Sequence, residues 1–261
     1  MRVLTMNSNT KHLLRAGIAL VTALVINGHV AAQNGPAPRM ADGHPDLSGI
    51  WWTGGDLGSP GYGKVTGAVP ATKTYTDLYT PEAAAKMKTL SDKDDPTLQC
   101  RPTAFGTLGV RLFDVGALGQ IVATPKMMVF LQETFHGYQL IPTDGRPHRT
   151  VPPSYRGDAV GHWEGDTFVV ETNNFTDDTW IFAEGRVSFH SDAMKVVERY
   201  QRADAKTLLV DATVYDPKVL KEPWVVPTRK LDLAPADQLL PLICSGVETQ
   251  ELMDNADKLK K

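Results

Sequence analysis

Short strand-like segments at close spacing limit most strongly what this chain can fold into. Between residues 120 and 231, runs rich in β-branched and aromatic residues alternate with turn signals, which is the pattern of successive strands. These runs cover residues 121–124, 128–132, 138–141, 158–163, 167–172, 195–202 and 207–215. Parallel strands need crossover connections, and the spacing leaves almost no room for crossover helices. This favours an antiparallel sheet curled into a barrel or a sandwich, and we expect a mainly β, lipocalin-like antiparallel β-barrel with a few peripheral helices.

Outside this region the sequence predicts one further strand and two helices. Residues 46–52 look like a strand that is entered from a turn. Thr80 followed by Pro81 predicts a helix that runs to about Leu90, since Thr caps helices and Pro is tolerated at their first position. A capping-box spacing that begins at Ser245 predicts a C-terminal helix.

Residues 1–32 have the layout of a secretory signal. They hold three basic residues and no acid, followed by an apolar run over residues 16–26 and a small-residue ending. That run is shorter than the ~20 residues that a spanning helix needs, so we expect no membrane span. Cleavage is expected near Ala32 and Gln33, which gives a periplasmic or secreted protein.

The remaining chain is expected to be one mildly acidic domain. Residues 33–45 are rich in Gly, Pro and Asn and predict a flexible lead-in, and residues 46–261 form the single barrel-like domain with its C-terminal helix. Removal of the signal changes the net charge from −3 to −6. Because no basic stripe accompanies this charge, we expect neither nucleic acid nor an anionic membrane surface as a partner.

The chain has two cysteines, Cys100 and Cys244. An exported protein reaches compartments where disulfides persist, so we expect the two residues to pair. The alternative is a pair of buried free thiols. A catalytic cysteine is disfavoured because neither residue lies in a recognisable nucleophile motif.

The turn at residues 144–148 supplies the first candidate for chemistry. Its sequence D-G-R-P-H places a carboxylate, a guanidinium and an imidazole close together. A histidine that acts as a base needs a fixed partner that sets its tautomer, so we expect Asp144 to orient His148 and Arg146 to stabilise developing negative charge. The alternative is that Asp144 caps the turn, Arg146 faces water and His148 fills a surface notch.

A second group of candidates would line a cavity in the barrel. We expect His190 or Glu198 to act as the acid, and Trp163, Trp180 and His162 to contact the substrate. The alternatives are core packing for the two tryptophans and a cross-strand pair for Glu198.

Metal and hydrolase motifs are missing from the sequence. The separations between His148, His162 and His190 match no ligand spacing, so we expect no metal and no cofactor. The chain also has no G-x-S-x-G elbow and no H-E-x-x-H pair, which disfavours the common serine and zinc hydrolases.

Two resemblances agree with this interpretation. The string D-L-S-G-I-W at residues 46–51 resembles the G-x-W strand that opens lipocalin-like (calycin) barrels. A wider set of strings is similar to a widespread family of secreted bacterial proteins: D-L-S-G-I-W, C-x-P at 100–102, I-V-x-T-P at 121–125, D-G-R-P-H at 144–148, W-E-G-D-T at 163–167, H-S-D at 190–192 and E-R-Y at 198–200. In that family Arg often precedes W-E-G-D-T, where this chain has His162. The resemblance implies export and a single domain, and it brings no catalytic roles to this chain.

These observations lead to two hypotheses from different classes. The first is an exported enzyme of the lyase, dehydratase or isomerase type, which performs metal-independent acid–base chemistry on a small, largely apolar or aromatic molecule in a barrel cavity. The second is a lipocalin-like carrier that holds such a molecule without catalysis.

Overall fold

The computed structural model describes residues 34–54, 73–106, 109–116, 118–182, 187–240 and 242–244. All of these residues belong to one compact unit. The expected signal at residues 1–32 and the expected C-terminal helix, which begins at Ser245, lie outside the described residues. No helix in the described ranges has the length and apolarity that crossing a bilayer requires.

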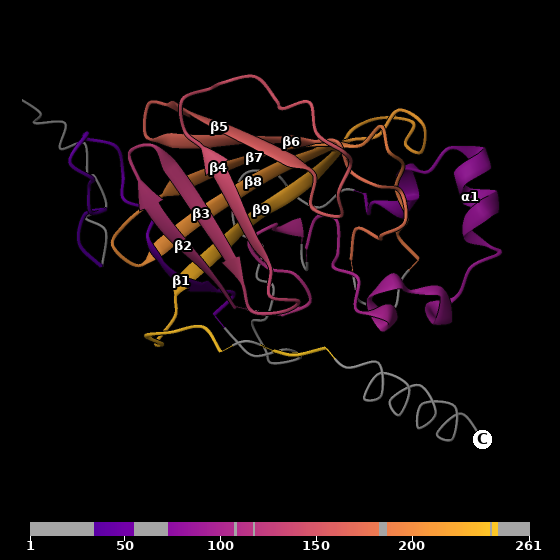
Figure 1. The fold of residues 1–261 in the computed structure, drawn as a ribbon, viewed down its shortest axis with the longest axis horizontal. Helices are drawn as coiled ribbons and strands as arrows, with labels where there is room; N and C mark the ends of the chain where they lie inside the picture. Colours follow the sequence, from indigo (N-terminus) through magenta and orange to yellow (C-terminus); the bar gives the residue numbers. More distant parts are fainter. Residues whose placement is uncertain are drawn as a thin grey trace, which may run out of the picture. The chain divides into compact units, whose positions relative to one another are not determined.

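An antiparallel sheet dominates the structure and curls into a nearly closed barrel (Figure 1). Its strands follow the order β4-β3-β2-β1-β9-β8-β7-β6-β5. Strands that follow one another in the chain therefore pair, except that β4 and β5 form the two edges, and β1 pairs with β9. The strands are β1 (Gly49–Trp52), β2 (Leu118–Thr124), β3 (Met127–Gln132), β4 (Tyr138–Pro142), β5 (Asp158–Glu164), β6 (Thr167–Asn173), β7 (Lys195–Arg202), β8 (Thr207–Tyr215) and β9 (Trp224–Leu233).

The expected mainly β class and barrel are confirmed, and each predicted strand overlaps an observed one. The strand β9 was not predicted, because Pro227 and the charged residues at its end obscure the alternation. The helix α1 (Pro81–Met87) begins where expected, and the hydroxyl of Thr80 accepts a hydrogen bond from the N–H of Ala83. Three short 3-10 turns accompany it: η1 (Thr76–Leu78), η2 (Asp92–Asp94) and η3 (Pro96–Gln99).

The number of strands determines how the barrel closes. Eight antiparallel pairings connect β4 to β5 through the sheet, so these two edge strands run in the same direction. The chain must therefore return along the barrel between them, and residues 143–157 form this return segment. Figure 1 shows β4 and β5 diverging toward the side on which α1 lies. We call the boundary between the two strands the seam.

Large side chains fill the interior of the barrel. Trp51, Phe130 and Phe168 are fully buried there, together with residues 110–113 from the loop that precedes β2. Gly119 permits this loop to enter, because a Cβ at that position would lie 2.3 Å from the carbonyl oxygen of Leu112. Each fully buried Phe stabilises the fold by about 1.5–3 kcal/mol. The barrel is thus a packed core.

A second buried cluster covers the end of the barrel from which β7 and β9 start. Tyr75 and Tyr79, which flank η1, pack there against Phe189 and Trp224. The hydroxyl of Tyr79 donates to the carbonyl of Phe189 over 2.9 Å. Trp180 also belongs to this cluster. The helical segment therefore closes one end of the barrel.

Residues 34–45, which were expected to be a flexible lead-in, contact the opposite end. Arg39 forms an ion pair with Asp166, with 2.7 Å between Nη2 and Oδ2. The imidazole of His44 stacks on Trp163, with ring centroids 4.5 Å apart and planes inclined by 3°. The described part of the lead-in is therefore docked on the barrel.

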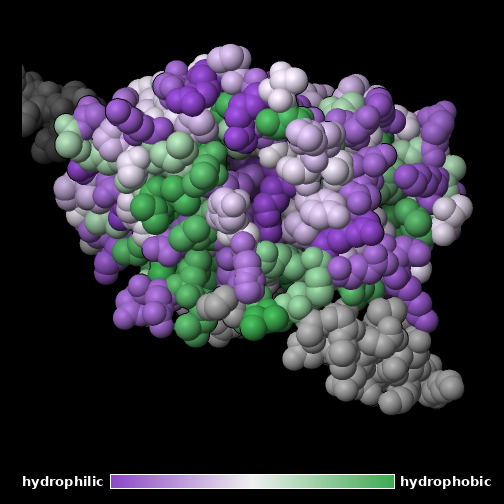
Figure 2. All heavy atoms as spheres, in the orientation of Figure 1, coloured by the Kyte–Doolittle hydropathy of each residue, from purple (hydrophilic) through white to green (hydrophobic). Residues whose placement is uncertain are grey.

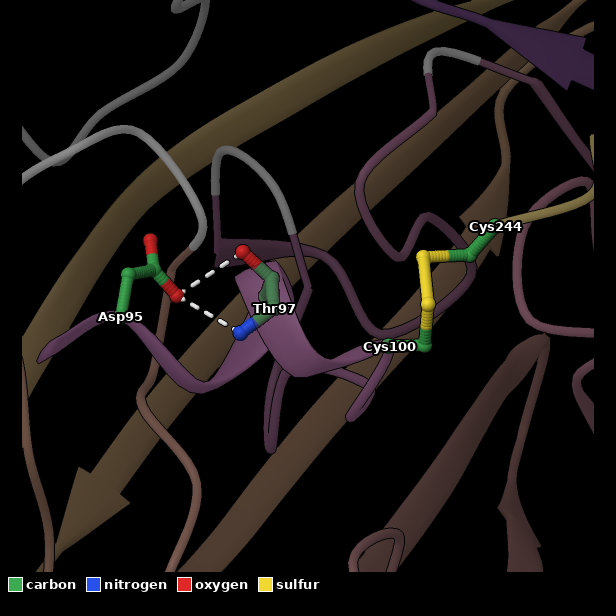
Figure 3. Close-up of a disulfide and its surroundings, with 4 residues drawn as sticks. All are labelled: Asp95, Thr97, Cys100 and Cys244. Atoms are coloured by element: carbon green, nitrogen blue, oxygen red, sulfur yellow. Dashed lines mark hydrogen bonds between the residues drawn. A yellow bond between two sulfur atoms is a disulfide. The ribbon is translucent and has the colours of Figure 1, made fainter. Parts of the chain in front are cut away.

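The predicted disulfide is present and joins η3 to the end of the described chain (Figure 3). Cys100 and Cys244 are 144 residues apart in the sequence, and their Cα atoms lie 5.7 Å apart. Asp95 caps η3, since its Oδ1 accepts hydrogen bonds from the N–H and the hydroxyl of Thr97. The cross-link therefore holds the segment after β9 against an ordered turn.

Loss of this disulfide is expected to destabilise the protein. A cross-link that closes so long a loop stabilises by about 2–5 kcal/mol, mainly by restricting the unfolded chain. In urea denaturation, Cys100→Ser and Cys244→Ser should each lower the free energy of unfolding by this amount, and the double variant should lose no more than either single one. An unchanged transition after reduction of the wild-type protein would contradict the structural role of the bond.

Candidate functional site

The D-G-R-P-H turn begins the return segment. Gly145 has a φ of +67°, which a glycine adopts without strain, and its N–H donates to the carbonyl of Gly161 in β5 over 2.9 Å. Asp144 and Arg146 form an exposed ion pair, with 2.7 Å between Oδ2 and Nη2. Hydrogen bonds from the Arg146 side chain lower the pKa of Asp144 to about 2. Asp144 also accepts the N–H of Arg146, so it caps the turn as the alternative interpretation expected, while its ion pair with Arg146 was not expected.

His148 has a carboxylate partner, but the partner is Asp158. The Nδ1 atom of His148 lies 3.1 Å from Oδ2 of Asp158, the first residue of β5. The same carboxylate accepts the N–H of Arg149 at 2.9 Å and its Nε–H at 2.6 Å. Asp144 is bonded to Arg146 instead, so the expectation that Asp144 orients His148 is corrected. The chain turns back after Asp144, which brings His148 to the start of β5.

The environment of Asp158 keeps its carboxylate charged. The side chain is only 1% exposed, and burial alone would raise its pKa. The hydrogen bonds from the N–H of Arg149, from its guanidinium and from His148 outweigh this effect, so the pKa of Asp158 lies below its usual value. A charged acceptor at Oδ2 favours the tautomer of His148 in which Nδ1 carries the proton. The lone pair is then on Nε2.

Nε2 of His148 has no hydrogen-bond partner among the described residues, and the side chain lines a surface hollow of about 620 Å³. We call this the polar hollow. Its wall includes Asn173 at the end of β6 and Lys195 at the start of β7. Lys195 forms an ion pair with Glu171 over 2.8 Å. A small polar molecule in this hollow would therefore contact an oriented imidazole.

His190, the first candidate for the acid, lies elsewhere in the core. It is 2% exposed, its Nε2 is 2.9 Å from the hydroxyl of Thr179, and its Nδ1 is 3.0 Å from the carbonyl of Ser191. Burial lowers its pKa below the usual value, so the ring is neutral near pH 7. It does not line the polar hollow. Both ring nitrogens of His190 thus have partners within the core.

Glu198, the second candidate, forms an ion pair inside the barrel. It is 0% exposed, and its Oε2 accepts a hydrogen bond from Nε of Arg111 over 2.8 Å. Its Oε1 accepts from the hydroxyl of Tyr200 over 2.8 Å. Burial and the neighbouring carboxylate raise the pKa of Tyr200. Removing one partner of such a buried pair costs about 3–5 kcal/mol, which indicates a structural role for Glu198.

The three residues expected to contact a substrate are not brought together. Trp163 packs on Phe168 at one end of the barrel, whereas Trp180 belongs to the cluster that closes the other end. His162 points outward from β5, and its Nε2 lies 3.1 Å from Oε1 of Glu164. These residues do not form one cavity.

Sequence reasoning missed Asp158 and Arg149. The available signal was an acid at the first position of a strand, ten residues after a histidine and close to several arginines. This signal identifies Asp158 as the partner of His148 only if one knows that the chain doubles back along β5. Within the described ranges, no three His, Cys, Asp or Glu side chains are grouped so as to hold a metal ion.

Comparison with known proteins adds no relative, since no family model, no curated protein and no solved structure matches the chain. The site must therefore be interpreted from its own geometry.

The lowered pKa of Asp158 predicts a pH-dependent contribution to stability. A group whose pKa is depressed on folding stabilises the native state above its unfolded pKa, and this effect disappears as the pH falls through the folded pKa. Asp158→Asn should therefore cost about 1–3 kcal/mol near pH 7, and the difference from wild type should shrink in acid.

Urea denaturation from neutral to acidic pH measures this difference. Asp144→Asn is the matched control, because its exposed partner leaves no buried group behind, and it should change the unfolding free energy little. A cost for Asp158→Asn that stays constant with pH would contradict the charged state of this carboxylate.

Proposed function

We propose that the protein is an exported enzyme that performs acid–base chemistry on a small organic molecule, with His148 as the group that transfers the proton. The observation that carries the proposal is the contact of 3.1 Å between Nδ1 of His148 and Oδ2 of Asp158. It fixes the ring and leaves Nε2 directed away from its partner, beside the polar hollow. General acid–base catalysis requires a side chain held in this way.

The residues have separate roles in the proposed reaction. Nε2 of His148 accepts a proton from the substrate, and the resulting imidazolium is stabilised by the Asp158 carboxylate. Arg149, which is 64% exposed, lies next to the imidazole and stabilises negative charge that develops on the substrate. The proton then returns to a leaving group in an elimination or dehydration, or to another atom in an isomerisation. No oxidant or reductant is needed.

The packing of the barrel supports an enzyme over a carrier. A lipocalin-like carrier holds its ligand inside the barrel. In this protein, the side chains of Trp51, Phe130 and Phe168 fill that space. The polar hollow lies outside that core, at the ends of β6 and β7. A site of this kind suits brief binding and turnover of a substrate.

Export is the second part of the proposal. The disulfide between Cys100 and Cys244 fits an extracellular or periplasmic location, because such bonds persist in oxidising compartments. The basic start, apolar run and small-residue ending of residues 1–32 add the sequence argument.

His148→Asn tests the catalytic role. The Asn side chain retains a donor toward Asp158 but has no equivalent of Nε2. Purified protein is incubated in D₂O with a pooled set of small hydroxy and carbonyl compounds, and mass spectrometry follows deuterium uptake and loss of water. The wild-type protein should convert at least one compound, and the variant should be slower by about 10²- to 10⁴-fold.

His136→Asn is the matched control, because His136 is exposed and does not line the polar hollow. It should retain full activity. Equal rates for His148→Asn and wild type would contradict the assignment, as would an equal loss in both histidine variants.

A further inference from the structure

A second cavity opens at the seam, on the other side of Arg149 from the polar hollow. It has a volume of about 450 Å³, within the range of small-molecule sites. Its wall comes from β4, from the return segment and from the start of β5. Figure 2 shows a hollow with hydrophilic side chains at its base, beside green hydrophobic side chains over the strands β2 to β4. We call it the seam cavity.

Gln139 supplies a polar atom in this wall that has no partner among the described residues. The side chain is only 7% exposed, and its Nε2–H donates to the carbonyl of Arg156 over 2.9 Å. This bond fixes the amide, so Oε1 is an acceptor. That oxygen is buried, and none of the residues that the structure describes donates a hydrogen bond to it. A buried acceptor without a partner costs about 1–3 kcal/mol, and a donor that reached this oxygen would remove that cost.

Two guanidinium groups give the same wall a positive surface. Arg149 uses Nε and Nη2 toward Asp158 and remains largely exposed. Arg156 uses Nη2 toward Asp114 over 2.5 Å, and the described residues offer no partner to its Nε and Nη1. The carboxylates of Asp158 and Asp114 are 1% exposed and lie behind the arginines, and the described residues that line the cavity include no acid. The accessible charge is therefore cationic.

The remaining wall is apolar and open to solvent. Tyr138 is 62% exposed and Leu140 is 53% exposed on the outer face of β4, on either side of the inward-facing Gln139. Tyr155 from the return segment faces the same cavity. Exposed aromatic and aliphatic side chains beside convergent polar groups are typical of ligand sites.

We propose that the seam cavity binds a small hydroxylated organic acid with an aromatic or aliphatic body. The carboxylate binds to Arg149 and Arg156, since planar guanidinium groups match its geometry. A hydroxyl of the ligand donates to Oε1 of Gln139. The apolar body packs against Tyr138, Leu140 and Tyr155. This binding does not require turnover at His148, so it stands independently of the proposed catalytic activity.

Isothermal titration calorimetry on the full protein tests the ligand class. The probes are mandelate and 4-hydroxyphenylacetate, which carry the hydroxyl near to and far from the carboxylate. Phenylacetate lacks the hydroxyl, and mandelamide lacks the charge. At least one hydroxy acid should bind with a Kd below about 1 mM, and the two control compounds should bind at least about tenfold more weakly. The proposal is overturned if neither hydroxy acid binds more tightly than these controls.

Variants of the cavity wall test where the hydroxy acid binds and which side chain contacts each of its groups. Arg149→Met should weaken binding of the hydroxy acid at least about tenfold, because the variant loses one charge-assisted hydrogen bond to the carboxylate. Arg146→Met is the matched control, because Arg146 is an exposed arginine on the same segment but does not line the cavity. Gln139→Leu should weaken the hydroxy acid and leave phenylacetate unchanged.

Because Arg149 also holds Asp158, a second pair of variants leaves that contact intact. Tyr138→Ala should weaken binding, and Tyr215→Ala, which removes another exposed tyrosine far from the seam, should not. Thermal unfolding confirms that each variant is folded. Equal affinity in Arg149→Met, Tyr138→Ala and wild type would place the ligand elsewhere and overturn the proposal. If His148→Asn loses turnover but binds the hydroxy acid as tightly as wild type, the proposed binding at the seam cavity stands.

Discussion

The buried carboxylate of Asp158 is the contact on which the closure of this barrel depends. Nine strands joined by antiparallel pairings leave β4 and β5 running in the same direction, so no hairpin can close the sheet. The return segment fills that place, and Asp158 holds it by accepting hydrogen bonds from His148 and from Arg149. The same three residues orient the imidazole and place a guanidinium between the two surface cavities.

This arrangement explains why the polar hollow and the seam cavity lie on the outside of the barrel. Aromatic side chains and the loop before β2 fill the interior, and the buried pair of Arg111 and Glu198 is part of that core. In an up-and-down barrel with a packed core and no seam, a ligand could bind only at the two ends. Here the divergence of β4 and β5 opens a cavity on the side of the sheet, and Gln139 and Arg156 are part of its wall.

The strands could be predicted from the sequence because alternation of apolar and polar residues is local information. The site could be predicted only in part, because a partner depends on where the chain turns. The spacing in D-G-R-P-H suggested that Asp144 orients His148, but the turn at Gly145 sends Asp144 into solvent and His148 to Asp158. Glu198 has the residue type of an acid catalyst, and only the tertiary structure reveals the arginine that pairs with it.

Native-state hydrogen exchange of the return segment tests the role of Asp158 most directly. The N–H of Arg149 is bonded to Asp158, and that of Gly145 to the carbonyl of Gly161. We predict that both amides are protected in the wild-type protein. In Asp158→Ala both should exchange at least about tenfold faster, while the amides shared by β7 and β8 keep their protection. Unchanged exchange at Gly145 and Arg149 in the variant would contradict the claim that this carboxylate holds the return segment in place at the seam.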